Sequence, residues 1–406
     1  MRARKDLPQR ARGGRLPRAR LTALLSSSLN RKVFPMSGET SAYVFPFRPF
    51  RNLDRSIPVA RIRDGGTCGL AAFEPQLGML APELGMPPSG ESWQERLIGL
   101  CCDPQTVFGR PEWIRDLAAH WIGMAEPFVA AKRPIEFTIL GFPFKAPVPL
   151  KTRRKLPDFG ELVMLRRLHE FALGVGRFHA PGARIHIFAE GAFARVNGMP
   201  QSDSDAYFDA LVALSEAAGF GETLVLHETS RIADETPGFL GVWEEMAEEI
   251  RARAKAGDEK TVTALREARP VTFHLCANPG VSEEQLRLAY LGDPAAAELR
   301  ADLERRSDEG VIRYRAFLEA RDKVRLLEDF APGALGLTVS PRPGRIGVRP
   351  LPEPANVLPY HGVPVWNEAE KQLRIEYRWD LITTDREWTG LYLEGDSDRE
   401  PFLLLE

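Results

Sequence analysis

The sequence contains no run of about 18 uninterrupted apolar residues, so no segment is a candidate for a transmembrane helix. It has four cysteines in 406 residues, too few for a disulfide framework, and no CxxC pair of the kind that binds structural zinc. We therefore expect a protein of the reducing cytoplasm that is not bound to a membrane. Hydrophobic residues make up 44% of the chain, enough for a large globular core.

Several common fingerprints of enzyme sites are also missing. The chain has no GxGxxG after a predicted strand, no GxxxxGK[ST], no GxSxG and no HExxH. The sequence therefore gives no indication of a dinucleotide site, a Walker-type phosphate site, a nucleophile elbow or a zincin site. His227 and His274 lie near the ends of predicted strands, where ligands often gather, but lone histidines there are more often core residues. We expect neither a metal ion nor a cofactor.

Acidic residues are nearly absent from the first 35 positions. This segment has ten Lys and Arg and a single acidic residue, Asp6, so its net charge is +9. Because the whole chain carries −2, the remaining residues carry −11. Such a leader could bind nucleic acid or an anionic surface, or act as a transit peptide. A disordered tail over residues 1–40, or translation from Met36, is the simpler interpretation. Because the remainder is acidic, we expect no nucleic-acid binding by the folded body.

Strand and helix patterns alternate after this leader. Residues 41–75 are rich in Pro, Gly and Arg and predict a loop. Apolar spacing predicts helices at 92–102, 111–131, 158–175, 205–218 and 239–256, with two more within 282–330. β-Branched and apolar runs predict strands at 135–141, 183–189, 223–227 and 271–275.

This alternation is typical of parallel βα units, so the predicted fold is α/β, a Rossmann-like layered sheet with flanking helices. We assign residues 41–330 to this catalytic domain. After residue 331 the pattern changes to short strands separated by Pro and Gly. Residues 331–406 are therefore expected to form a smaller β-rich part that completes the site.

The densest charged segment follows the predicted strand 135–141. Five basic residues lie within eleven positions: Lys145, Lys151, Arg153, Arg154 and Lys155. A basic loop at the carboxyl end of a buried strand can hold a phosphate or carboxylate, although a solvated loop is the alternative, above all for Arg153 and Arg154. Lys145 differs because it follows an aromatic stretch predicted to be buried. Burial would lower its pKa and suit it to acid/base work or anion binding.

Asp158 and Glu161 have two interpretations. Their spacing before a leucine-periodic segment is that of a capping box, in which the aspartate accepts hydrogen bonds from first-turn amides. Capping alone would account for both residues. Two carboxyl groups beside a basic loop could equally serve in proton transfer, and the sequence leaves both roles open.

These residues resemble the isonitrile (isocyanide) synthase family, also called the pyoverdine/dityrosine biosynthesis family. The runs Phe-Pro-Phe-Lys-Ala-Pro and Leu-Pro-Asp-Phe-Gly-Glu are similar to the family pattern FPxKSPN…K…PDxGE. Ala-Glu-Gly stands where the family has Ser-Asp-Gly, and Leu-Pro-Tyr-His-Gly-Val is similar to its Thr-Pro-Trp-His-x-Val element. These matches lie at residues 142–147, 156–161, 189–191 and 358–363.

The resemblance implies an enzyme of secondary-metabolite biosynthesis that forms a C–N bond. Family members convert the α-amino group of an aromatic amino acid, L-tyrosine or L-tryptophan, into an isonitrile. The extra carbon comes from the carbonyl of ribulose 5-phosphate, without a metal or redox cofactor. Each step needs proton transfer near neutral pH, and the phosphate needs a cationic clamp. The resemblance also implies a downstream tailoring oxygenase as a partner.

Site roles follow from the resemblance residue by residue. The expected catalytic residues are Lys145, Asp158, Glu161, Glu190 and His361. The expected substrate- or phosphate-binding residues are Lys151, Lys155, Arg342 and Arg345. If these roles hold, His361 faces the same pocket as Lys145 and Glu190.

Two departures from the family pattern bear on the product. Glu190 replaces an aspartate, which moves a carboxylate by about one methylene. Pro341 and Arg342 occupy the stretch in which the family has the histidine of Ser-Ile-His-Pro. An N-formyl or imine product, or a non-catalytic homologue that only binds a ligand, therefore remains an alternative.

Overall fold

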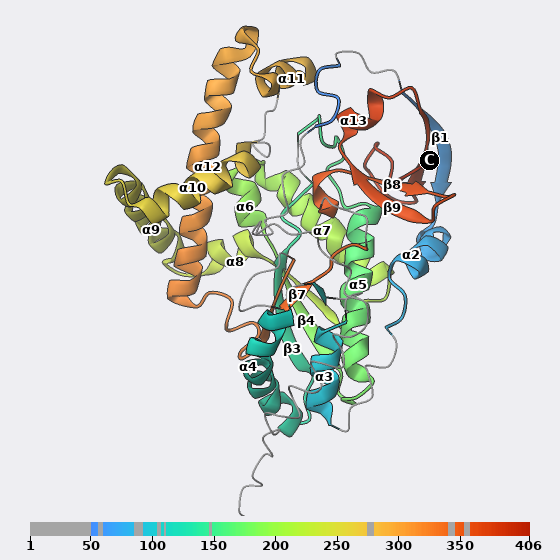
Figure 1. Cartoon of the computed structure of the whole chain (residues 1–406), viewed down its shortest axis with the longest axis vertical. Helices are drawn as coiled ribbons and strands as arrows, with labels where there is room; N and C mark the ends of the chain where they lie inside the picture. Colours follow the sequence, from blue (N-terminus) through green and yellow to red (C-terminus); the bar gives the residue numbers. More distant parts are fainter. Residues whose placement is uncertain are drawn as a thin grey trace, which may run out of the picture.

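Two β-sheets and a set of flanking helices form the molecule in the computed structural model (Figure 1). The structure describes residues 50–55, 60–84, 92–103, 107–108, 111–145, 148–273, 280–339, 346–352 and 358–406. The basic leader, His274, Arg342 and Arg345 lie outside the described residues. None of the described helices is long and apolar enough to cross a membrane.

The larger sheet has six strands in the order β2-β7-β6-β3-β4-β5. Every pairing in it is parallel except that of β2 with β7. In β3 every second side chain is buried, which is the period of a strand between two layers. The strands are β2 (Val107–Phe108), β3 (Ile135–Gly141), β4 (Ala183–Ala189), β5 (Leu224–Glu228), β6 (Leu335–Thr338) and β7 (Ile346–Val348).

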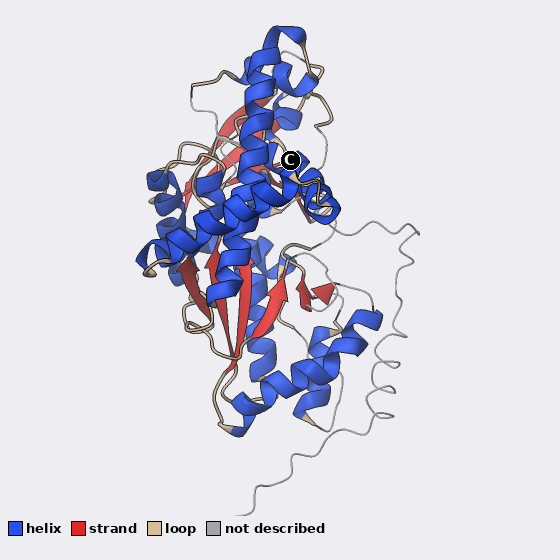
Figure 2. Cartoon of the chain, turned by 90° about the vertical axis from the view of Figure 1, so that its left-hand side faces the viewer, coloured by secondary structure: helices blue, strands red, loops and turns tan. Residues whose placement is uncertain are grey.

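Helices cover both faces of this sheet (Figure 2). One face packs in a core with α3 (Trp93–Cys101), α4 (Pro111–Ala130), α5 (Phe159–Gly176) and α7 (Gln201–Ala217). The other face packs with α6 (Gly191–Val196), α8 (Thr229–Glu235), α9 (Phe239–Lys255) and α12 (Ala297–Val324). α10 (Glu259–Phe273) packs against α9 and α12, whereas α11 (Glu283–Leu291) and the 3-10 turn η2 (Pro294–Ala296) pack in a separate cluster with Leu150 and Trp379. The predicted α/β layered fold is thereby confirmed.

The smaller sheet has five strands in the order β1-β10-β11-β8-β9 and carries the C-terminal residues. Its strands are β1 (Arg61–Cys68), β8 (Val363–Asn367), β9 (Gln372–Glu376), β10 (Glu387–Leu393) and β11 (Leu403–Leu405). The short elements η1 (Leu70–Phe73), α2 (Glu74–Leu80), η3 (Pro359–His361) and α13 (Arg378–Ile382) accompany it. Each sheet contains strands from both sides of residue 331. β6 and β7 follow this residue and join the larger sheet, and β1 precedes it and joins the smaller sheet.

Two local predictions were wrong. The segment 41–75, expected as loop, contains the strand β1, whose side chains are almost all exposed and therefore show no apolar alternation. Residues 271–273 of the expected strand 271–275 form the end of α10, which continues to Phe273, and residues 274–275 lie outside the described residues. A short apolar run cannot be assigned to strand or helix by its pattern alone.

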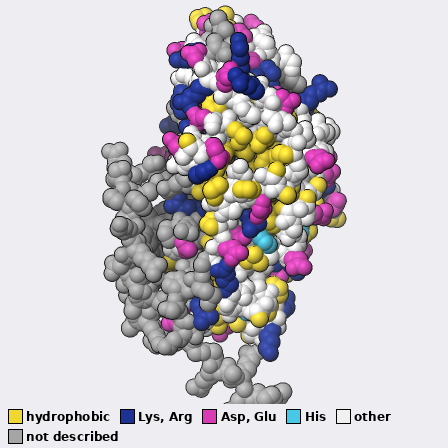
Figure 3. Space-filling model, turned by 90° about the vertical axis from the view of Figure 1, so that its right-hand side faces the viewer, with side chains coloured by type: hydrophobic (Ala, Val, Ile, Leu, Met, Phe, Trp, Pro, Cys, Tyr) yellow, Lys and Arg dark blue, Asp and Glu magenta, His cyan; other side chains and the backbone are white. Residues whose placement is uncertain are grey.

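The side of the molecule that carries β1 and α2 shows hydrophobic side chains gathered between charged ones (Figure 3). Ile62 of β1 is 40% exposed and Met79 of α2 is 49% exposed. Exposed apolar side chains are common on protein surfaces, so these two residues alone indicate no function.

Candidate active site

The carboxyl ends of three parallel strands bring the candidate residues together. Gly141 of β3 pairs with Ala189 of β4, and Ala189 pairs with Glu228 of β5. The chain leaves β3 toward Lys145 and leaves β4 directly into Glu190. Ligands of open α/β sheets bind at this edge, so the topology places the charged side chains where a substrate is expected.

Lys145 is fully buried and surrounded by oxygen atoms. Its Nζ lies 2.5 Å from Asp158 Oδ2 and 2.9 Å from Glu161 Oε2. It also donates hydrogen bonds to the carbonyls of Pro359 at 2.9 Å and Gly362 at 3.4 Å. A buried ammonium requires such partners, because an isolated charge in the interior is very costly. The lysine therefore joins the start of α5 to the segment around η3.

Asp158 and Glu161 form the predicted capping box and also bind Lys145. Asp158 Oδ1 accepts from the Gly160 amide at 2.9 Å, and Glu161 Oε2 accepts from the Asp158 amide at 2.9 Å. Burial and the charge of Glu161 raise the pKa of Asp158 well above its ordinary value. Burial alone would raise the pKa of Glu161, but Lys145 and the hydrogen bonds from Asp158 outweigh it and lower that pKa. The pair therefore offers one acid and one carboxylate side by side.

Three tyrosines, the buried Tyr207 and Tyr360 and the partly buried Tyr314, extend the group toward Glu190. Tyr207 donates a hydrogen bond to Glu161 Oε1 at 3.3 Å, and Tyr314 donates a short one to Glu190 Oε1. The pKa of Tyr360 is raised well above its ordinary value by burial and by the charges of Glu190 and Glu161. Burial also raises the pKa of Tyr207 and of Tyr314 well above the ordinary value, so these two phenols stay protonated and donate to Glu161 and Glu190.

Sequence reasoning did not assign a role to these tyrosines. Tyr207 lies on α7 with no pattern that relates it to α5. Tyr360 stands next to His361 in a run that resembles the family, and this position could have indicated that Tyr360 belongs to the site.

His361 lies beside Lys145 although the two residues are far apart in the sequence. The imidazole is half-buried and packs edge-on against Tyr360, with ring centroids 4.8 Å apart. Its Nδ1 is buried and has no hydrogen-bond partner among the described residues. Burial, followed by the positive charges of Lys151 and Lys145, lowers its pKa well below the ordinary value. The neutral ring can accept a proton from a bound molecule.

Lys151 is the second lysine of this interior. Its side chain is buried, and its Nζ lies 5.4 Å from the centroid of the Tyr377 ring. Burial lowers its pKa to about 7. Near neutral pH a substantial fraction of this amine is therefore uncharged.

The other described basic residues of the loop make different contacts. Arg154, expected to be exposed, is buried and forms an ion pair with Asp396, because its guanidinium ties the loop to the C-terminal segment. Arg153 is exposed, and Lys155 is exposed and binds Asp203 at 2.8 Å. Of the five basic residues, the structure therefore brings Lys145 and Lys151 to the interior group.

The glycine after Glu190 is required by close packing. A Cβ atom on Gly191 would lie 1.5 Å from Glu228 Oε1. Glu228 in turn caps α8, because its Oε2 accepts from the Arg231 amide at 2.6 Å and from Ser230 Oγ at 2.7 Å. The start of α6, which presents Glu190, thus rests directly on the carboxylate that ends β5.

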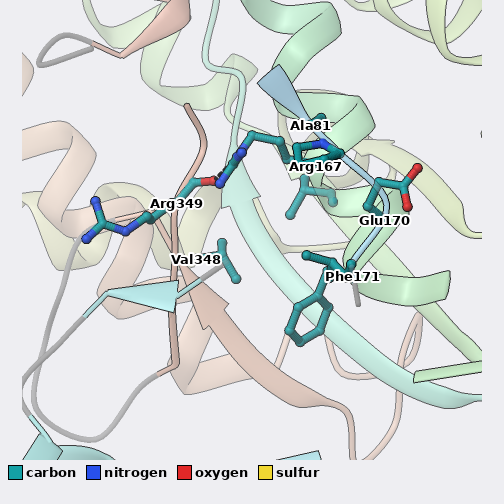
Figure 4. Close-up of a pocket in the computed structure, with 9 residues that line it drawn as sticks. Ala81, Arg167, Glu170, Phe171, Val348 and Arg349 are labelled. Atoms are coloured by element: carbon teal, nitrogen blue, oxygen red, sulfur yellow. Dashed lines mark hydrogen bonds between the residues drawn. The ribbon is translucent and has the colours of Figure 1, made fainter. Parts of the chain in front are cut away.

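A separate small pocket lies between α5 and the residue after β7 (Figure 4). Arg167 donates to the carbonyls of Leu80 at 2.7 Å and Arg349 at 3.0 Å. Burial and the charge of Arg349 lower the pKa of Arg167 to about 10. No candidate residue lines this pocket, and its arginine serves to join three segments of the chain.

Comparison with known proteins supports the resemblance seen in the sequence. Residues 125–287 match the family described as pyoverdine/dityrosine biosynthesis protein. The chain is 29% identical to an L-tyrosine isonitrile synthase of Pseudomonas aeruginosa over 255 residues, which are 59% of this chain and 72% of that protein. An L-tryptophan isonitrile synthase of Fischerella ambigua is 31% identical over 99 residues, 24% of this chain and 30% of that protein.

Two further proteins extend this comparison. Isocyanide synthase A of Aspergillus fumigatus is 33% identical over 95 residues, 22% of this chain and 16% of that protein. The crystal structure of the PvcA protein of Pseudomonas aeruginosa has a TM-score of 0.57 and 21% identity, covering 72% of this chain and 94% of that one. This likeness shows a shared fold. The matched region 125–287 contains Lys145, Asp158, Glu161 and Glu190.

Proposed function

Because residues 125–287 match the pyoverdine/dityrosine biosynthesis family, we propose that this protein is an isonitrile synthase acting on an aromatic amino acid. L-Tyrosine and L-tryptophan are the substrates named for its relatives. The observation that carries the proposal is the buried group of Lys145, Asp158 and Glu161 with His361 beside it. We further propose that ribulose 5-phosphate supplies the isonitrile carbon.

The state of the carboxyl groups fits the proton transfers of this reaction. The amine must lose a proton before it attacks the ketone, and the resulting hydroxyl must gain one before it leaves as water. Glu161, with its lowered pKa, and neutral His361 can accept protons, whereas Asp158, with its raised pKa, can donate one. An acid and a base are thus held within one helical turn of each other.

Aromatic side chains around Glu190 fit the proposed substrate class. The rings of Phe193 and Tyr314 have centroids 4.5 Å apart, and those of Phe142 and Tyr360 are 6.3 Å apart. Phe142 and Tyr360 are buried, whereas Phe193 and Tyr314 are partly exposed, and because aromatic rings favour tilted and offset contacts, the ring of a substrate can pack on this second pair. Glu190 is half-buried beside it and can bind the α-ammonium group.

The test is an incubation with ribulose 5-phosphate labelled with ¹³C at the ketone carbon, against a panel of aromatic and aliphatic amino acids. Mass spectrometry should find a labelled isonitrile with tyrosine or tryptophan, with or without a metal chelator. A labelled N-formyl or imine product would contradict the proposal and show that the protein catalyses the alternative reaction. Thermal stabilisation by a substrate without turnover would indicate a binding protein.

A further inference from the structure

We propose that Tyr314 is a positioning residue of the site. Its phenol holds the Glu190 carboxylate where that group meets the α-ammonium group of an amino acid, and its ring forms part of the wall for the aromatic side chain of the substrate. The inference rests on the proposed function for the identity of the substrate. It gives a role in substrate recognition to α12, a helix for which the sequence suggested no site residue.

The backbone of Glu190 is fixed, but its side chain does not cap the helix that it begins. The Glu190 amide donates to the Gly141 carbonyl at 3.2 Å, and the Glu190 carbonyl accepts from the Phe193 amide at 2.9 Å. The side chain makes no capping hydrogen bond with α6. The carboxylate instead accepts a hydrogen bond from the Tyr314 phenol. Its orientation therefore depends on α12 rather than on α6.

α12 approaches α6 closely just before Tyr314. A Cβ atom on Gly310 of α12 would lie 3.3 Å from the carbonyl oxygen of Val196, the last residue of α6. Tyr314 follows one turn later, on the same side of α12. Trp243 of α9 donates to the Arg313 carbonyl at 2.8 Å and so holds the preceding residue of α12 in place. The phenol is therefore presented to Glu190 from a fixed position.

The ring of Tyr314 belongs to the aromatic group beside Glu190. Its centroid is 4.5 Å from that of Phe193 and 6.4 Å from that of Phe317, with an interplanar angle of 14° to the latter. Phe317 is buried against Trp243, with ring centroids 5.2 Å apart, so the core supports the Tyr314 ring from behind. Glu190, Phe193 and Tyr314 are partly exposed, so a bound molecule can contact all three side chains.

This contact also accounts for the longer carboxylate at position 190. Glutamate has one more rotatable bond than the aspartate of the family pattern, and an unrestrained side chain would sample several rotamers. The Tyr314 hydrogen bond selects an orientation of the carboxylate beside the Phe193 ring. An ammonium-binding group and an aromatic wall held at a fixed separation favour aromatic α-amino acids over aliphatic ones.

Tyr314→Phe removes the hydroxyl and keeps the ring. Calorimetry should show that L-tyrosine or L-tryptophan binds this variant about 10-fold more weakly than the parent protein, because a hydrogen bond to a charged group is lost. In turnover assays KM for the amino acid should rise by a similar factor, whereas KM for ribulose 5-phosphate should stay unchanged. Tyr392→Phe, in β10 and outside the site, is the matched control and should change neither constant.

Glu190→Asp tests the pair from the other side, because it withdraws the carboxylate from the phenol. Alone it should weaken amino acid binding about as much as Tyr314→Phe does. The double variant Glu190→Asp/Tyr314→Phe should bind little more weakly than either single variant, since the same contact is lost in each. Effects that multiply in the double variant would overturn the inference.

The outcomes separate this inference from the proposed function. Weaker amino acid binding by Tyr314→Phe, without any isonitrile product from the parent protein, would support the inference and remove the function. Isonitrile formation by the parent with equal amino acid binding by both proteins would overturn the inference and leave the function intact. Equal rises of both KM values would indicate a general structural role for Tyr314 and likewise overturn the inference. A parent protein that binds no amino acid would overturn both.

Discussion

The charge of Lys145 favours the ionised form of both carboxyl groups next to it. Without the ammonium, Asp158 and Glu161 would face each other as two buried acids within one turn of α5. At Glu161 the ammonium and the hydrogen bonds from Asp158 outweigh burial and the pKa is lowered, whereas at Asp158 burial and the charge of Glu161 outweigh the ammonium and the pKa is raised, which is the asymmetry that acid/base chemistry needs. One side chain therefore supports both the local structure and the proposed reaction.

Lys145→Met should destabilise the protein strongly, in contrast to Arg153→Met. Removing one partner of a buried ion pair leaves the other charge uncompensated, which typically costs about 3–5 kcal/mol. Arg153 is exposed and its pair with Glu283 should contribute at most about 1 kcal/mol. Urea unfolding of the two variants measures the difference. Equal, small losses would contradict the assignment of a structural charge to Lys145.

Asp158→Asn separates capping from acid catalysis. The asparagine oxygen can still accept from the Gly160 amide, so α5 should keep its start and the protein its fold. The variant has no acidic proton, so turnover should fall by about 10²–10⁴-fold. Asp258→Asn is the matched control, because Asp258 caps a different helix, α10, through the Thr261 amide at 2.8 Å. Similar turnover in both variants would show that Asp158 only caps.

Among the elements, those with strong local patterns could be predicted and those held by backbone pairing could not. β3, β4, β5 and α5 show apolar periodicity or a capping box, and the structure confirms them. β1 carries almost no buried side chain and is defined by its hydrogen bonds to β10, at the other end of the chain, which no local pattern contains. A strand that depends on pairing with a distant segment cannot be predicted from its own residues.

The same distinction applies to the candidate site. Lys145, Asp158 and Glu161 lie within seventeen positions, and their charge density marked them in the sequence. The approach of His361 depends on the Lys145 hydrogen bond to the Pro359 carbonyl, 214 positions away, so only a family resemblance could suggest it. Tyr207 and Tyr314 belong to helices whose contacts with the carboxylates appear only in the folded chain.

At the junction of β4 and α6, Gly191→Ala should destabilise the protein because the new Cβ would overlap Glu228 Oε1. Forced repacking of this kind typically costs about 1–3 kcal/mol. Gly78→Ala on α2 is the control, since no atom lies within 4 Å of the position that its Cβ would take and alanine favours a helix. In a Glu228→Ala background the cost of Gly191→Ala should shrink, and a double-mutant cycle by urea unfolding measures this coupling. Additive costs would contradict the contact.

For the molecule as a whole, partly buried histidines contribute to the dependence of stability on pH. His227 of β5 lies beside His186, with 2.9 Å between ring nitrogens, and His186 in turn binds Glu136 at 2.9 Å. Burial and the neighbouring His186 lower the pKa of His227 to about 4, and burial and Arg166 lower the pKa of His169 to about 4. Both rings are therefore neutral in the folded protein over a range in which they become charged once the chain unfolds.

The folded protein should accordingly lose stability as the pH falls from about 6.5 toward 4. In this window the unfolded chain, whose histidines have a pKa near about 6.5, binds more protons than the folded one, so protonation favours unfolding. Urea unfolding at several pH values measures the slope. His227→Gln removes one of the histidines with a lowered pKa and should flatten the slope, whatever it does to the stability at pH 7, whereas His120→Gln at an exposed position of α4 should leave the slope as it is. An unchanged slope in His227→Gln would show that the ring beside His186 is protonated in the folded state.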